Sequence, residues 1–461
     1  MQITKREFLK NLALGSAAVA TGAVKADEYV PDLSSLPKGS CGDPNNVWFG
    51  KHIFPLEPTM TDNESCSLVN GEVWEPAKKI PIFHQTDVVV VGGGPAGFAA
   101  AIAAARGGAK VALVERYGSL GGLFTNGMVL LMMATGRLES SGKWTLVTRG
   151  ICEEFMRKAE ALGPDFCTRH PGDRRHWQPT VDPEAAKYLM DKMIAESGVE
   201  MFFHSWGVDV IQKGDKVQGV VFESKEGRQA ILAKEIVDCT GDADMLFRAG
   251  GSYRQITHSI GFVSRWANVD RISPDVVGFK HGNEGNPSTH WANSLGPKGN
   301  GLSVRELSAA EVLHRRENWE KVTKLRATKG YEKLFTANTC SQIGPRATRL
   351  VDTREIVGRK ELFEKTVSNE TIGWCGHDGA GVAFAVPWGQ IVPKKLKNLL
   401  VAGRCLGKGD TVDVFRLICP CFVTGQAAGV AAALAVRKGI SSCDLDYPSI
   451  RRELLKQDVY L

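Results

Sequence analysis

A glycine-rich turn near residue 92 constrains the fold more than any other feature of this 461-residue chain. Residues 92–97 read Gly-Gly-Gly-Pro-Ala-Gly and satisfy the pattern G-x-G-x-x-G. The run Asp87–Val91 before the turn is rich in β-branched residues, as in a buried parallel strand, and the alanine-rich run 97–107 after it predicts a helix. A turn in this position brings a pyrophosphate to the N–H groups of a helix N-terminus. The sequence therefore predicts a Rossmann-like dinucleotide-binding unit.

Each glycine of the pattern has its own expected role. Gly92 permits the tight turn, Gly94 lets a pyrophosphate approach the backbone, and Gly97 lets helix and strand pack closely. The next predicted strand, 110–115, ends at Glu115, whose carboxylate we expect to accept hydrogen bonds from the adenosine ribose. These features predict a bound dinucleotide but leave FAD and NAD both open.

Five further segments, at residues 115–123, 240–242, 346–358, 398–405 and 425–429, resemble the family of FAD-dependent oxidoreductases. Residues 115–123 resemble its Glu-x-x-x-x-x-Gly-Gly segment, in which the glycine pair passes along the flavin. Residues 240–242, Thr-Gly-Asp, resemble its strand-ending Ala-Thr-Gly segment, and the arginine-rich segment 346–358 also has a counterpart there. Near the C-terminus, residues 398–405 and 425–429 match its signatures N-L-L-V-A-G-R-C and G-Q-A-A-G. The resemblance covers about residues 84–440 and implies that the cofactor is FAD.

The motifs and the resemblance together imply a set of FAD-binding residues. A strand ending at Gly403 would place backbone N–H groups near the ribityl chain or the phosphates. A helix beginning near Gly425 could point its free N–H groups at the flavin, where reduced flavin carries negative charge. The expected FAD-binding residues are Gly92, Gly94, Pro95, Ala96, Gly97, Glu115, Arg116, Gly121, Gly122, Leu123, Thr240, Gly241, Asp242, Gly403, Arg404, Gly425 and Gln426.

Strand, turn and helix signals occur in three separate pieces of the chain. The predicted fold class is therefore α/β, with a Rossmann-like FAD-binding domain built from three segments and an inserted α+β substrate or cap domain. The predicted divisions are a signal peptide at 1–26, an irregular arm at 27–83, the FAD-binding domain at 84–123, 187–250 and 383–440, the cap at 124–186 and 251–382, and a C-terminal tail at 441–461.

The first 26 residues have the composition of an export signal. A charged start is followed by a short apolar run, and small residues precede a cleavage point before Asp27. The segment resembles a twin-arginine signal, except that Lys5 replaces the first arginine. A general secretory route or an uncleaved membrane-associated helix are the alternatives. We expect a periplasmic protein that does not span the membrane after cleavage.

Charge and cysteine usage exclude several classes of function. The formal net charge of +6 falls to +3 when residues 1–26 are set aside, so no basic stripe for nucleic acid is expected. The 11 cysteines form no C-x-x-C pattern, and we predict no metal site. Cys41 and Cys66 could pair in an oxidising compartment or remain as thiols.

The catalytic candidates come from the less regular segments. Arg354 and Arg416 suit bidentate carboxylate binding, although phosphate contacts or surface ion pairs are alternatives. His377, in a glycine-containing loop, is a candidate acid–base group. The family often carries a histidine between the arginines that correspond to Arg404 and Arg416, but here that stretch contains Asp410 and Asp413 instead. Either aspartate could replace that histidine, contact the ribityl chain or be a surface charge.

The resemblance implies two-electron transfer through the flavin N5. We expect a hydride to pass between the flavin and a small polar organic substrate, in either direction, with a cytochrome, a quinone or a small redox protein as electron partner. One alternative is an electron-relay subunit of a respiratory complex, which would lack a closed substrate pocket above the flavin. Another is a flavin-dependent RNA-modifying enzyme, against which the export signal and the balanced charge argue.

Overall fold

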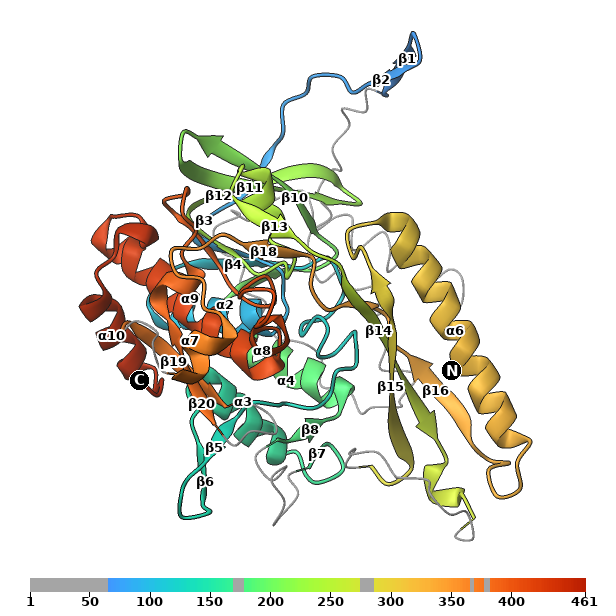
Figure 1. The fold of residues 1–461 in the computed structure, drawn as a ribbon. Coiled ribbons are helices and arrows are strands. Elements are labelled where there is room, and N and C mark those ends of the chain that lie inside the picture. Colours follow the sequence, from blue (N-terminus) through green and yellow to red (C-terminus); the bar gives the residue numbers. More distant parts are fainter. Residues whose placement is uncertain (1–64, 169–177, 274–285, 365–368, 377–381) are drawn as a thin grey trace, which may run out of the picture.

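The computed structural model describes residues 65–168, 178–273, 286–364, 369–376 and 382–461. Its centre is a seven-stranded sheet with the order β10-β11-β12-β3-β4-β9, in which β21 also pairs with β12 (Figure 1). The strands are β3 (Ile82–Val91), β4 (Val111–Val114), β9 (Glu200–Phe202), β10 (Trp206–Lys213), β11 (Lys216–Ser224), β12 (Gly227–Asp238) and β21 (Leu399–Val401).

The parallel part of this sheet brings distant parts of the sequence together. β21, β12, β3, β4 and β9 run parallel to their neighbours, while β10, β11 and the first half of β12 pair antiparallel. The carboxyl ends of β3, β4, β12 and β21 therefore meet at one edge. In open α/β sheets ligands bind at that edge.

Two apolar helices, α2 (Pro95–Arg106) and α9 (Ile418–Lys438), pack on each other and contact β3 and β12. Gly425 and Gly429 make this contact possible, because a Cβ at Gly425 would stand 2.0 Å from the Ala96 carbonyl oxygen. The predicted helix start near Gly425 was wrong: α9 begins at Ile418, and Pro420 lies in its first turn, where a missing N–H is tolerated.

α9 is also long and apolar enough to cross a membrane by length and composition, but its most apolar stretch is entirely buried inside the protein. Two further boundaries differ from the sequence predictions. The sequence predicts a hairpin of residues 200–213 with 216–223, but the first of these runs divides at His204, which has a left-handed backbone (φ 55°). β9 therefore joins β4, and only β10 forms the hairpin with β11. The described part of the predicted arm contains a small hairpin of β1 (Ser67–Val69) and β2 (Glu72–Trp74).

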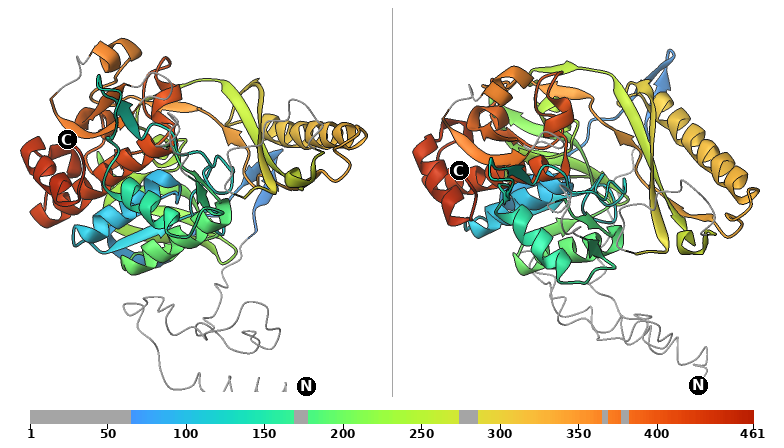
Figure 2. Two further views of the ribbon diagram at one scale, coloured as in Figure 1. Left: turned by 90° about the horizontal axis from the view of Figure 1, so that it is seen from below. Right: turned by 60° about the horizontal axis from the view of Figure 1, so that its bottom comes forward.

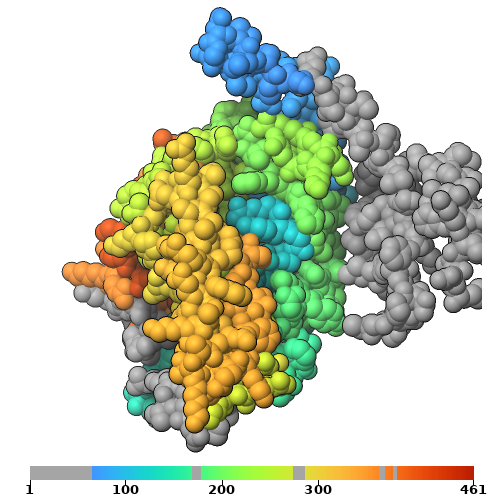
Figure 3. Space-filling view, turned by 90° about the vertical axis from the view of Figure 1, so that its right-hand side faces the viewer, coloured from blue at the N-terminus to red at the C-terminus, as the bar shows by residue number. Residues whose placement is uncertain are grey.

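A second sheet lies beside the first. It contains β14 (His258–Ala267), β15 (Thr289–Gly299), β16 (Phe335–Thr339) and β17 (Gly344–Pro345). Helix α6 (Val304–Arg326) covers it, and the Phe262 ring of β14 stacks on His314 of α6 with 5.4 Å between ring centroids. In both views of Figure 2, α6 lies on the side of this sheet that is away from α2 and α9, and Figure 3 shows it running along the outer face.

Shorter elements connect and cover these two sheets. They are β5 (Gly136–Leu138), β6 (Trp144–Leu146), α3 (Ile151–Glu160), β7 (Cys167–Thr168), β8 (Thr180–Val181), α4 (Pro183–Glu196), α5 (Asp244–Arg248), β13 (Tyr253–Gln255), η5 (Val269–Arg271), β18 (Arg349–Val351), α7 (Arg359–Glu364), β19 (Thr371–Gly376), β20 (Ala383–Pro387), η6 (Trp388–Ile391), α8 (Val412–Phe415), η7 (Ser442–Asp444) and α10 (Tyr447–Lys456).

The fold class is α/β, as the sequence predicted, with a Rossmann-like sheet assembled from strands in residues 82–114, 200–238 and 399–401 and a mixed unit inserted between them. The predicted division into domains, residue by residue, stays a prediction. The predicted signal peptide and Cys41 lie outside the described residues, while Cys66 is exposed.

Candidate functional site

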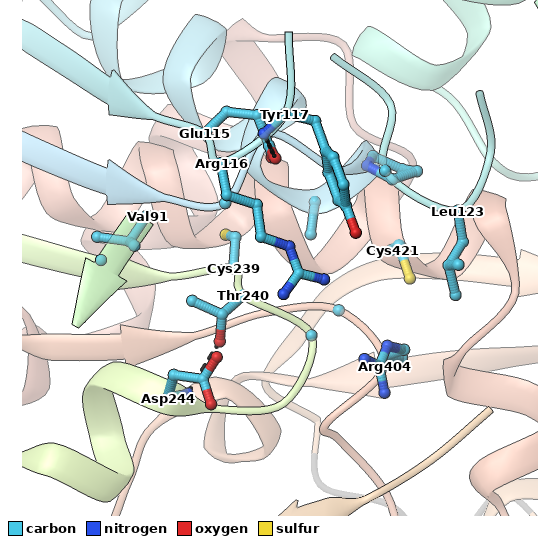
Figure 4. A pocket seen from close by; sticks show the side chains of 18 of the residues that line it. Val91, Glu115, Arg116, Tyr117, Leu123, Cys239, Thr240, Asp244, Arg404 and Cys421 are labelled. Carbon is cyan, nitrogen blue, oxygen red and sulfur yellow. Dashed lines mark hydrogen bonds between the residues drawn. The ribbon is translucent and has the colours of Figure 1, made fainter. Parts of the chain in front are cut away.

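A cavity lies at the carboxyl edge of the parallel strands (Figure 4). It contains about 840 Å³ of empty space, including the solvent at its mouth. Thirteen of the predicted site residues line it, from six separate parts of the sequence. They are Gly92, Gly94, Pro95, Ala96, Glu115, Arg116, Gly122, Leu123, Thr240, Gly241, Gly403, Arg404 and Arg416.

The three glycines of the first turn are glycine for different structural reasons. Gly92 has φ +97°, and a Cβ there would stand 2.5 Å from the Cys239 carbonyl oxygen. A Cβ at Gly97 would stand 1.7 Å from the Gly92 carbonyl oxygen. At Gly94, by contrast, φ is −65° and no described atom lies within 4 Å of an added Cβ. The fold therefore requires Gly92 and Gly97, whereas the space beside Gly94 is open for a ligand.

The N-terminus of α2 is suited to an anion. Gly94 is its N-cap residue, and no side chain in the described part of the chain caps the helix. The first backbone bond of the helix runs from Phe98 N–H to the Gly94 carbonyl, so the N–H groups of Ala96 and Gly97 precede it. These groups and the helix dipole favour a phosphate at this end of the cavity.

Glu115 lies at the end of β4 with its carboxylate fixed by backbone donors. Its Oε2 accepts a hydrogen bond from Gly93 N–H at 2.6 Å, and its Oε1 accepts one from Tyr117 N–H at 2.9 Å. Burial raises the pKa of Glu115, and both N–H donors oppose that effect. The carboxylate is thus held rigidly at the wall of the cavity, where further lone pairs can accept hydrogen bonds from a ribose.

We expect Glu115→Gln to weaken FAD binding by about ten- to hundred-fold, because a hydrogen bond to a charged group contributes roughly 1.5–3 kcal/mol. The dissociation constant from flavin fluorescence quenching measures the change. Glu154→Gln is the control: Glu154 lies on α3, pairs with Arg106 at 2.8 Å and does not line the cavity. Equal affinities for the two variants would contradict the assigned role.

One wall of the cavity was missed by the sequence analysis. Ser205, Trp206 and Gly207 line it where the chain enters β10. The Arg116 guanidinium lies 4.9 Å from the Tyr117 ring centroid and 5.5 Å from that of Trp206. Dividing the predicted strand 200–213 near residue 203 would have indicated this wall. Residues 203–207 then follow a parallel strand next to β4, and such residues lie at the carboxyl edge of the sheet.

The role of Asp242 needs correction. It is not among the described residues that line the cavity. Its Oδ2 pairs with Arg404 Nη2 at 2.7 Å, and its Oδ1 accepts a hydrogen bond from the Thr348 hydroxyl. Arg404 itself lines the cavity, and its buried Nη1 has no hydrogen-bond partner within the described ranges. Asp242 therefore orients Arg404, and Arg404 presents a free donor to the ligand.

The predicted contact of Gln426 with the flavin is also wrong. Its Oε1 accepts a hydrogen bond from Ile151 N–H at 3.0 Å, and its Nε2 donates to the Gln457 carbonyl at 3.1 Å, which ties α9 to α3 and to the C-terminus. The cause is the earlier start of α9: Ile418 and Cys421, from its first turn, line the cavity, whereas Gly425 and Gln426 lie further along the helix.

Two other predicted FAD-binding residues, Gly97 and Gly121, are not among the described residues that line the cavity, but they shape the turns around it. Gly97 belongs to the helix–strand contact described above. Gly121 has φ +100°, and a Cβ there would stand 2.4 Å from Thr125 Cγ2, so it serves the turn after Glu115.

The three catalytic candidates have different outcomes. Arg416 lines the cavity, and its buried Nε has no hydrogen-bond partner in the described part of the chain. Arg354 is exposed and does not belong to the described lining, so the described geometry lends its predicted catalytic role no support. His377 lies outside the described residues.

Gln342 is a further lining residue that no sequence signal indicated. Its Oε1 is buried without a hydrogen-bond partner among the residues that the structure describes. Asp410 and Asp413, considered as replacements for a family histidine, are exposed instead. Arg359 contacts both of them, with 3.2 Å between its Nη1 and Asp413 Oδ2. Within the described ranges no three histidine, cysteine, aspartate or glutamate side chains gather as for a metal ion.

The residues fit FAD. The open space beside Gly94, the uncapped helix end, the fixed Glu115 carboxylate and the free donor of Arg404 line one continuous cavity. An anionic pyrophosphate, a ribose and a polar ring edge each have a counterpart there. When bound, FAD supplies hydride transfer at its N5.

Comparisons with known proteins support FAD as the cofactor. Residues 87–264 and 265–454 match the family model described as FAD dependent oxidoreductase. A 287-residue stretch is 26% identical to digeranylgeranylglycerophospholipid reductase 2 of Methanothermobacter thermautotrophicus, over 59% of this chain and 70% of that protein. A 46-residue stretch is 61% identical to a dihydrolipoyl dehydrogenase of Trypanosoma brucei brucei, but spans only 10% of each protein.

Solved structures align at low identity. A geranylgeranyl bacteriochlorophyll reductase-like protein of Thermoplasma acidophilum aligns with 15% identity and a TM-score of 0.43, over 82% of this chain and 84% of that one. A myxobacterial FAD-dependent halogenase aligns with 15% identity and a TM-score of 0.44, over 80% and 78%. The family match spans nearly all of the described chain, and the protein belongs to the FAD-dependent oxidoreductases, with FAD as its cofactor.

Proposed function

We propose that this oxidoreductase works outside the cytoplasm and transfers a hydride between the flavin N5 and a small polar organic substrate. The second half of the reaction exchanges electrons with a respiratory partner, a cytochrome, a quinone or a small redox protein. Support for export comes from the signal-like composition of residues 1–26, which lie outside the described residues. NAD(P)H is scarce in the periplasm, which favours a respiratory partner.

One observation carries the substrate part of the proposal. The cavity continues beyond the glycine turn to Gln342 and Arg416, neither of which is among the residues expected to bind FAD. Each has a buried polar atom without a partner in the described ranges. Buried polar groups cost free energy unless they are hydrogen-bonded, so these atoms favour a polar ligand of their own. An electron-relay subunit has no need for such a pocket.

An anaerobic titration tests the reaction. The mature, FAD-loaded protein is mixed with hydroxy acids, amines, sugars and artificial donors while the absorbance of the oxidised flavin is followed. We expect one substrate class to bleach it, or the chemically reduced protein to be reoxidised by one class of acceptor. Reduction and reoxidation by redox proteins alone, with no response to any small molecule, would favour the electron-relay alternative.

Cell fractionation tests the export part separately. The full chain should appear in the periplasm with its flavin, and a chain without residues 1–26 should remain in the cytoplasm. Retention of the full chain in the cytoplasm would overturn the proposed location without touching the chemistry.

A further inference from the structure

A group of positive side chains borders the cavity beside Arg416. Ser259 of β14 is the reference point: it pairs across the sheet with Lys298 of β15, and on its other side its carbonyl accepts a hydrogen bond from Arg346 N–H at 3.4 Å. His258 precedes Ser259 on the same strand. We call Lys298, Arg346 and Arg416 the cationic cluster, and His258 lies beside it.

The cluster is next to the cavity and not on a remote surface. Arg346 follows Gln342 in one short segment, and Gln342 and Arg416 both line the cavity. Between them, a Cβ at Gly344 would stand 3.8 Å from Leu123 Cδ2, and Leu123 is itself a lining residue. The segment 342–346 therefore runs beside the part of the cavity wall that Leu123 and Gln342 line.

The cluster lacks counter-charge. None of Lys298, Arg346 and Arg416 forms an ion pair with an acid among the described residues. Asp413 is the acid that acts on the cluster, and it is half exposed and shared with Arg359 at 3.2 Å. Arg346 and Arg416 are half-buried, whereas Lys298 is exposed. Half-buried cations without partners are costly, and proteins tolerate such groups where a ligand supplies the opposite charge.

The electrostatics are consistent with this imbalance. Burial, and then the neighbouring Arg346, lower the pKa of Arg416 to about 10, although Asp413 opposes the shift. Burial also lowers the pKa of Arg346. The pKa of His258 is lowered by burial and then by Arg416, Arg346 and Lys298, against Asp413.

The lowered pKa of His258 favours its neutral form. Its Nδ1 accepts a hydrogen bond from Ser259 N–H at 2.8 Å, so the neutral ring carries its proton on Nε2. Nε2 is then a hydrogen-bond donor that adds no charge to the cluster.

We propose that the cationic cluster binds the carboxylate groups of the substrate, so that the small polar molecule of the proposed function is an organic dicarboxylate. Arginine guanidinium groups bind carboxylates with paired hydrogen bonds. The three cations and the shared Asp413 carboxylate leave an excess of positive charge, which a dianion would balance. The inference rests on the proposed function, because the anion bound here is the molecule that exchanges the hydride.

Binding of malonate to the FAD-loaded protein tests this assignment without turnover. Malonate is a dicarboxylate without a CH–CH bond to oxidise, so calorimetry and the shift of the flavin spectrum report binding alone. Malonate should bind more tightly than acetate, and neutral malonamide should not bind. Arg346→Gln and Arg416→Gln should each weaken malonate binding by about ten- to hundred-fold, since each removes a charged hydrogen-bond donor.

Two further variants make the test specific. Arg316→Gln makes the same charge change on the outer helix α6, where Arg316 is exposed and lies 3.8 Å from Glu320, and should leave malonate binding unchanged. Asp413→Asn removes the opposing acid and should tighten it. The FAD content and the melting temperature of each variant are measured alongside malonate binding, so that a folding defect is recognised.

Three results would overturn the assignment. Malonate does not bind; inorganic phosphate or sulfate binds as tightly as malonate; or the Arg346 and Arg416 variants change FAD affinity while malonate affinity stays constant, which would show that the cluster serves the flavin. None of these depends on catalysis. If donors in the panel reduce the flavin but malonate fails to bind, the proposed reaction stands and the dicarboxylate assignment falls.

Discussion

Gly94→Ala is expected to abolish tight FAD binding while leaving the apoprotein as stable as wild type. Gly94 has φ −65°, which alanine adopts without strain, and no described atom lies within 4 Å of the added Cβ. The methyl group would occupy space at the N-terminus of α2, where the pyrophosphate is expected. An extra methyl in a filled site costs about 1–3 kcal/mol, so the affinity should fall roughly ten- to hundred-fold.

Two variants serve as matched controls for Gly94→Ala. Gly409→Ala is the same change on an exposed loop, where the nearest described atom to the Cβ is Arg254 Nη2 at 3.5 Å, and it should alter neither affinity nor melting temperature. Gly97→Ala would place its Cβ 1.7 Å from the Gly92 carbonyl oxygen and should lower the melting temperature of the apoprotein as well. Unchanged FAD affinity in the folded Gly94→Ala protein would remove the pyrophosphate from this position.

The contrast between these glycines shows what the sequence can and cannot provide. The pattern at 92–97 and the acid at Glu115 predicted a Rossmann-like unit, because a strand, a glycine turn, a helix and an acid at this spacing satisfy one local geometry. The pattern also predicted different roles for Gly94, beside the ligand, and Gly97, in the contact between helix and strand. These features depend on residues close in sequence, and local geometry is what a pattern encodes.

Features that depend on tertiary partners were predicted less well. Gly425 and Gln426 looked like the start of a helix facing the flavin, but the helix begins at Ile418. Asp242 looked like a residue that contacts FAD, but its carboxylate pairs with Arg404. In each case the deciding contact comes from a segment more than 100 residues away, such as Ala96 for Gly425 or Arg404 for Asp242, and no spacing in the sequence announces it.

Gln342 illustrates the remaining gap. It belongs to no motif. It reaches the cavity because β17, which follows it, pairs antiparallel with β14 and lies close to Leu123. Arg346 was visible as one of several arginines, but its neighbours Lys298 and His258 join it only through sheet pairing. A cavity wall that depends on strand pairing between distant segments leaves no local pattern in the sequence, which explains why the cofactor was easier to predict than the substrate.

Gly429→Ala should destabilise the protein strongly, although helix propensity alone predicts the opposite sign. In the middle of a helix, alanine is about 1 kcal/mol more favourable than glycine. Here, however, α9 packs so closely on α2 that a Cβ at Gly429 would stand 2.1 Å from the Ala100 carbonyl oxygen. Both positions are completely buried, so the helices must separate, and such overpacking costs about 1–3 kcal/mol or more.

Thermal and denaturant unfolding of the apoprotein measure the effect of Gly429→Ala, because bound FAD would add stability of its own. Gly409→Ala, which adds the same methyl group in open space, again provides the comparison. Gly429 lies one turn of α9 beyond Gly425 and outside the described lining of the cavity, so FAD affinity of the protein that still folds should change less than its stability. A higher melting temperature for Gly429→Ala would mean that propensity outweighs the contact, and the close packing of α2 on α9 would then not hold in solution.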